Sequence, residues 1–298
     1  LCESLLASPV LAAGRGLYRS LRKRDWLLRA YQRLLEAGDD ATTIPRRHRL
    51  SADEFYARYY CAHRPVILTG FFDLWEHLAA FSPAALRARY GDAEVEVQGD
   101  RDQDPLFEEH APQLRRRVRF ADFIQRVEHG PDGNNVYMTA QNAQANAAAL
   151  GPLFQAPATL DEYLDRGALT GRTFLWYGPA GTVTPLHHDR TNNLVAQLRG
   201  RKRVRYVSSY QLPLLYNDRG VFSPLNLDLL DDPGQRSRYP LSQRLRVQEC
   251  VLAPGEALFL PVGGWHDVRA LDVSVSLTYT AFRRDNDFRD DGEPEARY

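Results

Sequence analysis

Cysteine and net charge are both scarce in this chain. Its three cysteines, Cys2, Cys61 and Cys250, are odd in number and show no C-x-x-C spacing, so neither a disulfide framework nor a thiolate zinc site is indicated. The 38 basic residues balance the 38 acidic ones, and no global field therefore favours nucleic acid or an anionic membrane as a partner. A local basic patch stays compatible with this composition. Scattered thiols fit a reducing compartment, and we expect a cytoplasmic protein.

Long apolar runs are also missing. No stretch of about 18 apolar residues occurs, so the sequence predicts no membrane-spanning helix and no membrane partner. The segment LLASPVLAAGRGLYRSLRKR (residues 5–24) has a short apolar start followed by arginines, the reverse of the charge order in a secretory signal. Because the first residue is Leu1 and not a methionine, we expect a trimmed or partial product.

The first half of the chain predicts helices that alternate with short strands. Residues 16–37 place leucines and a tyrosine at helical intervals, which indicates one amphipathic helix or a helix pair. Ser51 and Glu54 form a capping box at the start of another helix. The further elements are helices over 51–60, 82–91 and 118–130, and strands over 65–70, 94–99 and 134–142.

Beyond Gly171 the pattern changes to short strands punctuated by glycine and proline, which is typical of a sandwich or barrel. Helical periods are visible there only around 209–216 and 224–238. We predict a mainly β fold with some α: a jelly roll over residues 136–282, an N-terminal helical and α/β extension over 1–135 packed on it, and a polar, mobile tail over 283–298. The eight strands are expected over 172–178, 182–189, 193–200, 202–209, 245–255, 256–262, 266–271 and 272–282.

Three residues form a candidate metal site. The stretch TPLHHDRTNN contains His187 and Asp189 as an H-x-D pair, and PVGGWHDV contributes His266. Side chains at i and i+2 of a strand share a face, so His187 and Asp189 point the same way while His188 points to the other side. Two imidazoles and one carboxylate cover one face of an octahedral metal and leave positions open, as in non-haem Fe(II) oxygenases. The alternative is a hydrogen-bonded polar patch.

Lysine is rare in this chain, and Lys202 is therefore a candidate for a specific role in ligand binding. The chain's only lysines are Lys23 and Lys202, the other basic residues being arginines. A compact ammonium group suits the distal carboxylate of a dicarboxylate ligand, with the Thr184 hydroxyl as a further donor. The other interpretation is a single charge in the solvated basic run RGRKRVR.

Three motifs carry a family resemblance: G-x-x-T-P-x-H-x-D at 181–189, N-L-x-A-Q-x-x-G-x-K-R at 193–203 and P-G-E-A-L-F-L-P-x-x-x-W-H at 254–266. Residues 171–282 resemble the cupin-like JmjC hydroxylases, the Fe(II)- and 2-oxoglutarate-dependent group that includes the hypoxia-response asparaginyl hydroxylase and the tRNA wybutosine hydroxylase. The resemblance implies a double-stranded β-helix with iron on His187, Asp189 and His266.

The resemblance also implies a binding site for 2-oxoglutarate. Lys202, Thr184 and a tyrosine matched by Tyr137 would hold its distal carboxylate, and Asn193 would stand near its C1 carboxylate. Thr278 occupies the position of a second asparagine in the asparaginyl hydroxylase, a departure that leaves the C1 contact open. Core packing is the competing interpretation for Tyr137 and Thr278, and for Trp176, which could instead wall the pocket.

The implied chemistry is hydroxylation with 2-oxoglutarate and O₂ as co-substrates and no catalytic side chain beyond the metal ligands. A protein or peptide side chain is the first choice of substrate, with a small molecule or a modified tRNA base as alternatives. The arginine clusters at 46–50 and 115–119 could contact phosphates, but pairing with acids is favoured in a neutral chain.

Two other classes of protein stay open from the sequence: a metal-bound cupin that does not use 2-oxoglutarate, and a catalytically silent interaction domain. A homodimer built by the N-terminal helices is compatible with the sequence. A dimer through C-terminal helices is not expected, because the chain ends in the polar tail over 283–298.

Overall fold

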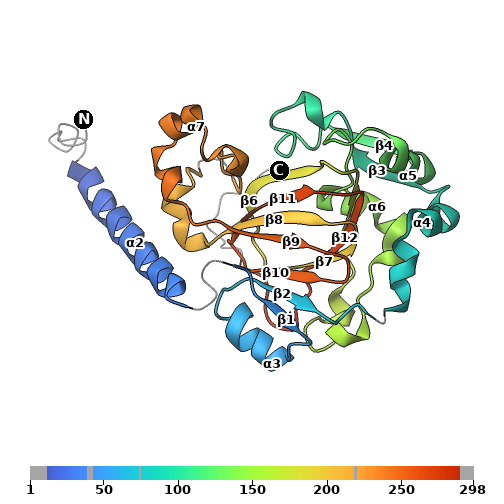
Figure 1. Ribbon diagram of the computed structural model, residues 1–298, viewed down its shortest axis with the longest axis horizontal. Coiled ribbons are helices and arrows are strands. Elements are labelled where there is room, and N and C mark those ends of the chain that lie inside the picture. Colours follow the sequence, from blue (N-terminus) through green and yellow to red (C-terminus); the bar gives the residue numbers. More distant parts are fainter. Residues whose placement is uncertain (1–11, 39–42, 74, 218–219, 289–298) are drawn as a thin grey trace.

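Two β-sheets face each other in the computed structural model (Figure 1). A cavity lies between them. The structure describes residues 12–38, 43–73, 75–217 and 220–288. The six-stranded sheet has the order β1 (Arg46–His48), β2 (Val66–Thr69), β10 (Ala257–Leu260), β7 (Asn193–Arg199), β12 (Ser274–Tyr279) and β5 (Thr173–Gly178). The four-stranded sheet has the order β6 (Val183–His188), β11 (Trp265–Ala270), β8 (Lys202–Val207) and β9 (Gln248–Leu252). Neighbouring strands are antiparallel except β1 and β2, which run parallel.

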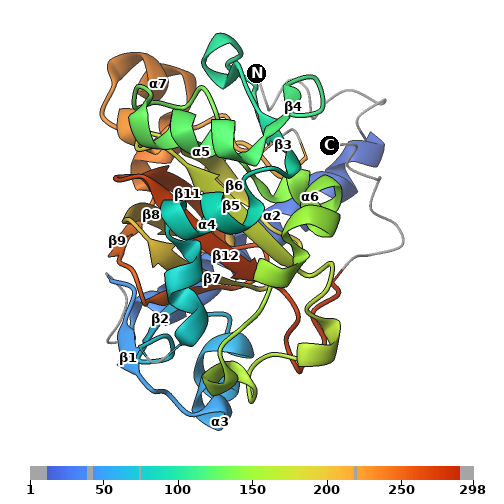
Figure 2. The same ribbon diagram turned by 90° about the vertical axis from the view of Figure 1, so that its right-hand side faces the viewer.

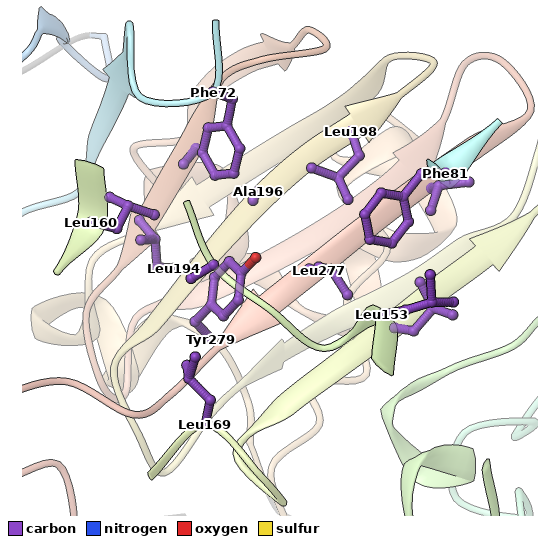
Figure 3. Close-up of a cluster of buried hydrophobic side chains, with 14 of the residues drawn as sticks. Phe72, Phe81, Leu153, Leu160, Leu169, Leu194, Ala196, Leu198, Leu277 and Tyr279 are labelled. Atoms are coloured by element: carbon purple, nitrogen blue, oxygen red, sulfur yellow. The ribbon is translucent and has the colours of Figure 1, made fainter. Parts of the chain in front are cut away.

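The alternation of side chains along the central strands separates the core from the cavity. On β7, Leu194, Ala196 and Leu198 point into the main hydrophobic core, whereas Asn193 and Val195 line the cavity. Figure 3 shows these three core residues beside Leu277 and Tyr279 of β12, with Phe72 and Phe81 of the N-terminal part packed against them. Burial of this face holds the N-terminal part on the sheet.

The second half of the chain follows the prediction closely. All eight strands predicted beyond Gly171 are present as β5 to β12, and the cupin/JmjC fold class is confirmed. The helical periods around 209–216 and 224–238 correspond to short elements: the 3₁₀ helices η9 (Ser209–Leu214) and η10 (Leu227–Leu229) and the helix α7 (Pro233–Arg238). The 3₁₀ helix η11 (Pro240–Arg244) follows beyond the predicted range.

The chain before β5 lies around the six-stranded sheet, and its helices α4 (Pro83–Tyr90), α5 (Phe120–His129) and α6 (Ala143–Leu150) cover the side on which β5 lies (Figure 2). Its strands β3 (Glu94–Gln98) and β4 (Arg115–Arg119) form a separate two-stranded sheet. Its helices are α2 (Ala12–Glu36), α3 (Ala52–Phe55), α4 (Pro83–Tyr90), α5 (Phe120–His129) and α6 (Ala143–Leu150), α3 being followed by the π-helix η2 (Tyr56–Tyr60). Shorter 3₁₀ helices are η3 (Glu76–Phe81), η4 (Arg101–Gln103), η5 (Ala140–Asn142), η6 (Gly151–Leu153), η7 (Ala158–Leu160) and η8 (Arg166–Ala168).

Several predictions for this part need correction. The helix expected over 118–130 begins at Phe120, because Arg115–Arg119 pairs with β3 as a strand. The strand expected over 134–142 is reduced to two isolated bridges, Tyr137 with Gln98 and Met138 with Tyr177, before η5 begins. Ser51 caps α3 through the backbone N–H of Glu54 at 3.3 Å, as its sequence predicts.

The domain boundary expected near residue 135 stays a prediction, but the N-terminal part does more than pack on the barrel. Its strand β2 pairs with β10, so it extends the six-stranded sheet. Helix α2 is a single helix that projects from the body in Figure 1 and exposes Trp26 and Leu34. None of the helices in the described part of the chain is long and apolar enough to span a bilayer.

Both ends of the chain carry predictions that lie partly outside the described residues. The apolar start of segment 5–24 and most of the polar tail belong to this group. The described beginning of the tail contacts the body, and the expected mobility of the tail stays a prediction. Asn286 is buried there, and its side chain accepts hydrogen bonds from both the backbone and the side-chain amide of Asn192, at 2.8 and 2.9 Å.

Candidate metal centre

The three residues of the predicted metal site converge at one end of the four-stranded sheet. His187 on β6 lies directly opposite His266 on β11 in the strand register, and Asp189 follows β6. One ligand atom from each of the three lies within 4.8 Å of the others. Nε2 of His187 is 3.9 Å from Oδ1 of Asp189, and Nε2 of His266 is 3.6 Å from Oδ2. This arrangement is consistent with Fe(II).

Backbone carbonyls fix the orientation of both imidazoles. Nδ1 of His187 lies 2.8 Å from the carbonyl oxygen of Pro185, and Nδ1 of His266 lies 3.0 Å from that of Gly264. Because a carbonyl only accepts, each Nδ1 carries a proton, and in the neutral ring the lone pair is therefore on Nε2. Burial, helped by the neighbouring His187, lowers the pKa of His266 to about 4. The ring is therefore neutral, which is the form that binds a metal.

A second set of contacts fixes Asp189. The side-chain amide of Asn193 donates a hydrogen bond to Oδ2 of Asp189, and the hydroxyl of Thr191 donates to Oδ1 of Asn193 at 3.2 Å. The carbonyl of Asp189 accepts from the backbone N–H of Gly263 at 2.9 Å, which ties it to the loop before His266. The carboxylate thus reaches the site with its rotamer already set.

His188 lies outside this group, as the alternation along β6 predicts. Its ring packs edge-on against Trp265, with ring centroids 4.8 Å apart. Burial lowers the pKa of this imidazole. The side chain therefore serves packing on the opposite side of the sheet.

The metal site opens into a cavity of about 460 Å³ between the two sheets. Every site residue predicted from the sequence lines this cavity: Tyr137, Thr184, His187, Asp189, Asn193, Lys202, His266 and Thr278. Apolar side chains of both sheets, such as Val195, Val204 and Leu258, form much of the remaining wall.

Lys202 is the unusual charge of this cavity. Its side chain is 3% exposed, and Nζ donates a hydrogen bond to the Tyr137 hydroxyl at 3.2 Å. In the described ranges no carboxylate lies within ion-pair distance of it, and burial lowers its pKa to about 7. A buried cation without a counter-charge is costly. The site therefore fits an anionic ligand with a carboxylate near Nζ.

Tyr137 and Thr278 have clear positions in the same wall. Tyr137 lies so close to β5 that a Cβ atom on Gly178 would be 2.6 Å from its Cδ2, so glycine is required there. Burial raises the pKa of Tyr137, and its hydroxyl stays protonated. The Thr278 hydroxyl accepts a hydrogen bond from Nε1 of Trp176 at 3.0 Å. Trp176 also lines the cavity, so it belongs to the wall as well as to the packing.

Sequence reasoning missed three residues beside this site. Arg101 is fully buried, donates to Glu108 at 2.9 Å and to the carbonyl of Val183 at 2.8 Å, and lies 5.3 Å from the Tyr137 ring. Glu108 lines the cavity, as does Phe222, whose ring centroid is 6.0 Å from that of His187. Arg101 stands in the polar run GDRDQD, and a buried ion pair within such a run has no signal in the sequence.

The arginine cluster at 115–119 is paired with acids. Arg115, Arg116, Arg117 and Arg119 contact carboxylates at 3.5, 2.9, 3.3 and 2.8 Å, those of Glu96, Asp100, Glu94 and Asp92 respectively. In the cluster at 46–50, Arg46 pairs with Glu256 at 2.8 Å. These contacts support the interpretation that the cluster at 115–119 and Arg46 are paired with acids within the protein.

Comparison with known proteins agrees with the fold. The model of the cupin-like domain family matches residues 52–284, and the chain belongs to that family. The sequence is similar to JmjC-type proteins from animals and plants.

Among curated relatives, lysine-specific demethylase 8 of Xenopus tropicalis is 30% identical over 246 residues, which are 81% of this chain and 53% of the relative. Lysine-specific demethylase JMJ30 of Arabidopsis thaliana is 28% identical over 251 residues, 79% of this chain and 54% of the relative. Jumonji C domain-containing protein 5 of Drosophila melanogaster is also 28% identical over 251 residues, 79% of this chain and 59% of the relative. The chain thus spans little more than half the length of these relatives.

Proposed function

We propose that this chain is an Fe(II)- and 2-oxoglutarate-dependent oxygenase that hydroxylates a side chain of a protein or peptide. The proposal depends above all on one observation: a two-histidine, one-carboxylate metal site shares its cavity with a buried lysine that has no acidic partner among the described residues. The metal site alone suits several kinds of cupin. The lysine adds a site for a dicarboxylate co-substrate.

Different residues of the cavity would bind the metal and the co-substrate. His187, Asp189 and His266 would hold Fe(II) on one face and leave the other positions for co-substrate and O₂. Lys202 and Tyr137 would hold the distal carboxylate of 2-oxoglutarate. When bound, iron and 2-oxoglutarate supply the oxidising chemistry. The protein excludes water with the apolar walls and positions a C–H bond of the substrate.

Three further residues support these tasks. Thr184 lines the cavity and would add a hydroxyl donor for the distal carboxylate. Asn193 donates to Asp189, so we assign it first to orienting that carboxylate, while its contact with the C1 carboxylate stays a prediction. Thr278 holds Trp176 through a hydrogen bond, and we assign it to shaping the wall.

A polypeptide is the preferred substrate class. Two of the relatives described above are, by their names, lysine-specific demethylases, which favours a protein substrate for this chain. The paired arginines at 115–119 weaken the case for RNA. A small molecule or a modified tRNA base is kept as the alternative, to be separated by a screen of peptides, amino acids and RNAs for stimulated succinate formation.

Anaerobic titration of the Fe(II)-loaded protein with 2-oxoglutarate tests the proposal against a cupin that does not use this co-substrate. Bidentate binding of the keto acid to Fe(II) is expected to produce a visible charge-transfer band that saturates. The same titration with succinate, which lacks the keto group, is the control. Metal binding without any band or affinity for 2-oxoglutarate would point to the other class of cupin.

A further inference from the structure

A second cavity, of about 440 Å³, lies on the outer face of the four-stranded sheet. Side chains that alternate along the sheet divide between the two cavities: Lys202 and His266 line the metal cavity, whereas Arg203 and Arg269 line this one. The segments 105–109 and 222–228 and the end of α7 form its other walls. In Figure 1, α7 lies beyond the edge of this sheet.

Arg203 on β8 and Arg269 on β11 lie directly opposite each other in the strand register. Like charges in that relationship repel, so the pair destabilises the sheet unless an anion compensates it. The next pair on the same face of the sheet, Arg205 and Asp267, is of opposite charge and forms a two-pronged ion pair. The like-charged pair is therefore a local exception on this face.

One carboxylate, that of Asp228 on η10, serves both members of the pair and Arg205 as well. It accepts from Nη2 of Arg203 at 2.8 Å, from Nη1 of Arg205 at 2.8 Å and from Nη2 of Arg269 at 3.2 Å. Asp267 supplies the only other carboxylate in direct contact with these guanidinium groups among the residues described. Three guanidinium groups of this cluster thus share two carboxylates, and Glu108, Glu109 and Arg238 also line the cavity.

The two arginine side chains are accessible to a ligand. The side chain of Arg269 is 42% exposed and that of Arg203 is 24% exposed, against 9% for Arg205. A guanidinium offers five N–H donors, and these two arginines each use only one in the contacts to Asp228. Nε of Arg203 is buried without a hydrogen-bond partner. The pair is therefore under-satisfied in its hydrogen bonds.

This cavity adjoins the metal cavity. Glu108, Phe222 and Val268 line both. Arg269 is three residues along β11 from His266, which corresponds to about 10 Å along a strand. Because the two cavities lie on opposite faces of the sheet, a peptide with one side chain at the metal would reach the arginine pair by passing the residues that line both cavities.

We propose that the Arg203–Arg269 pair binds an acidic side chain, Asp or Glu, of the polypeptide substrate, near the residue that enters the metal cavity. This inference rests on the proposed function, because the peptide that it describes is the substrate of the proposed oxygenase. The N–H donors that Arg203 and Arg269 leave unused fit one further carboxylate, which planar guanidinium groups bind in a two-pronged manner. A nucleic-acid backbone would need a wider basic surface than this cavity offers.

The test uses two pools of short fluorescein-labelled peptides, with the other positions randomised over uncharged residues and one fixed position holding Glu in one pool and Gln in the other. Binding to the metal-loaded protein is followed by fluorescence anisotropy. Wild-type protein is expected to bind the Glu pool roughly tenfold more tightly than the Gln pool, the effect of a charge-assisted hydrogen bond. The preference should weaken with added salt.

Two variants are expected to change the preference for the Glu pool in opposite directions. The double variant Arg203→Gln/Arg269→Gln should lose the preference for Glu, whereas Asp228→Asn should strengthen it because it removes a competing carboxylate. Arg117→Gln, which breaks an exposed ion pair with Glu94 at 3.3 Å, is the matched control and should behave as wild type. Equal affinity of wild type for both pools, or an unchanged preference in the double variant, would overturn the proposal.

The 2-oxoglutarate titration described above is run on the same samples. A protein that binds 2-oxoglutarate but does not distinguish the pools refutes only the acidic-residue site. A protein that distinguishes the pools but does not bind 2-oxoglutarate refutes the proposed function, and with it the substrate role of the site. Retained thermal unfolding transitions in the variants verify that they are folded.

Discussion

The hydroxyl oxygen of Tyr137 lies 3.2 Å from Nζ of Lys202, at the wall of the metal cavity. This hydrogen bond joins the segment before β5 to β8 and pairs a buried phenol with a buried ammonium group. A neutral hydroxyl cannot balance the lysine's charge. The pair is thus arranged for a third, anionic participant.

Replacement of Lys202 by methionine should separate stability from binding. The folded-state pKa of about 7 lies below the ordinary value of 10.5, so the unfolded chain binds more protons between these values. Through this group, stability therefore rises as pH increases from about 7 to 10.5. Lys202→Met should stabilise the ligand-free protein at pH 7 by a few kcal/mol, with about 4 as the upper bound, and should abolish 2-oxoglutarate binding.

Urea unfolding at pH 7 and pH 10 measures the first effect and calorimetric titration the second. The chain's other lysine, Lys23, is exposed on α2, and Lys23→Met is the matched control. It should change stability by less than about 0.5 kcal/mol. A lower free energy of unfolding for Lys202→Met than for wild type at pH 7 would contradict the assignment of an uncompensated buried charge.

Binding of 2-oxoglutarate should weaken as the pH rises above 7. The distal carboxylate requires the ammonium form of Lys202, which the free protein loses above its pKa of about 7. The dissociation constant is expected to rise by up to about tenfold for each pH unit above 7. In Lys202→Arg, whose guanidinium stays charged, this dependence should disappear whatever the absolute affinity. A flat profile for wild type would count against Lys202 as the carboxylate partner.

Removal of the Tyr137 hydroxyl tests the other half of the pair. Tyr137→Phe keeps the ring against Gly178 and loses only the hydrogen bond. The KM for 2-oxoglutarate should rise roughly tenfold, the effect of a lost hydrogen bond to a charged group, whereas kcat at saturating co-substrate should change little. A fall in kcat with an unchanged KM would place the hydroxyl elsewhere in the reaction.

The sequence predicted the strands and the metal site well for a physical reason. Alternating side chains along β5 to β12 carry the period of a half-buried sheet, and the same period places His187 and Asp189 on one face. Scarcity of lysine drew attention to Lys202, which does line the cavity.

What the sequence could not predict depends on contacts between distant segments. The run RRRVR at 115–119 reads as polar, yet it forms a strand because its acidic partners lie on β3 and near it. The sequence around Arg101 suggests a solvated side chain. In the structure Arg101 is buried and donates hydrogen bonds to Glu108 and to the carbonyl of Val183. The 134–142 segment has strand-like residues but finds only single bridges as partners.

Asn193 should control metal affinity through Asp189. Its amide donates to Oδ2 of Asp189, and groups that orient a ligand in this way typically contribute 10- to 100-fold to metal affinity. Asn193→Ala should therefore weaken Fe(II) binding by about that factor, as measured by metal competition under anaerobic conditions. Thr191→Val, which removes only the support of Asn193, should have a smaller effect. Equal metal affinity of Asn193→Ala and wild type would assign the amide to the co-substrate alone.

O₂-dependent conversion of 2-oxoglutarate to succinate tests the central claim most directly. Wild-type protein loaded with Fe(II) should release succinate only when O₂ is present, and His187→Ala and Asp189→Ala should abolish that release. His188→Phe, which keeps a ring against Trp265 and leaves the metal ligands intact, should retain it. Full succinate release by His187→Ala, or none by wild type with Fe(II) and 2-oxoglutarate bound, would contradict the account.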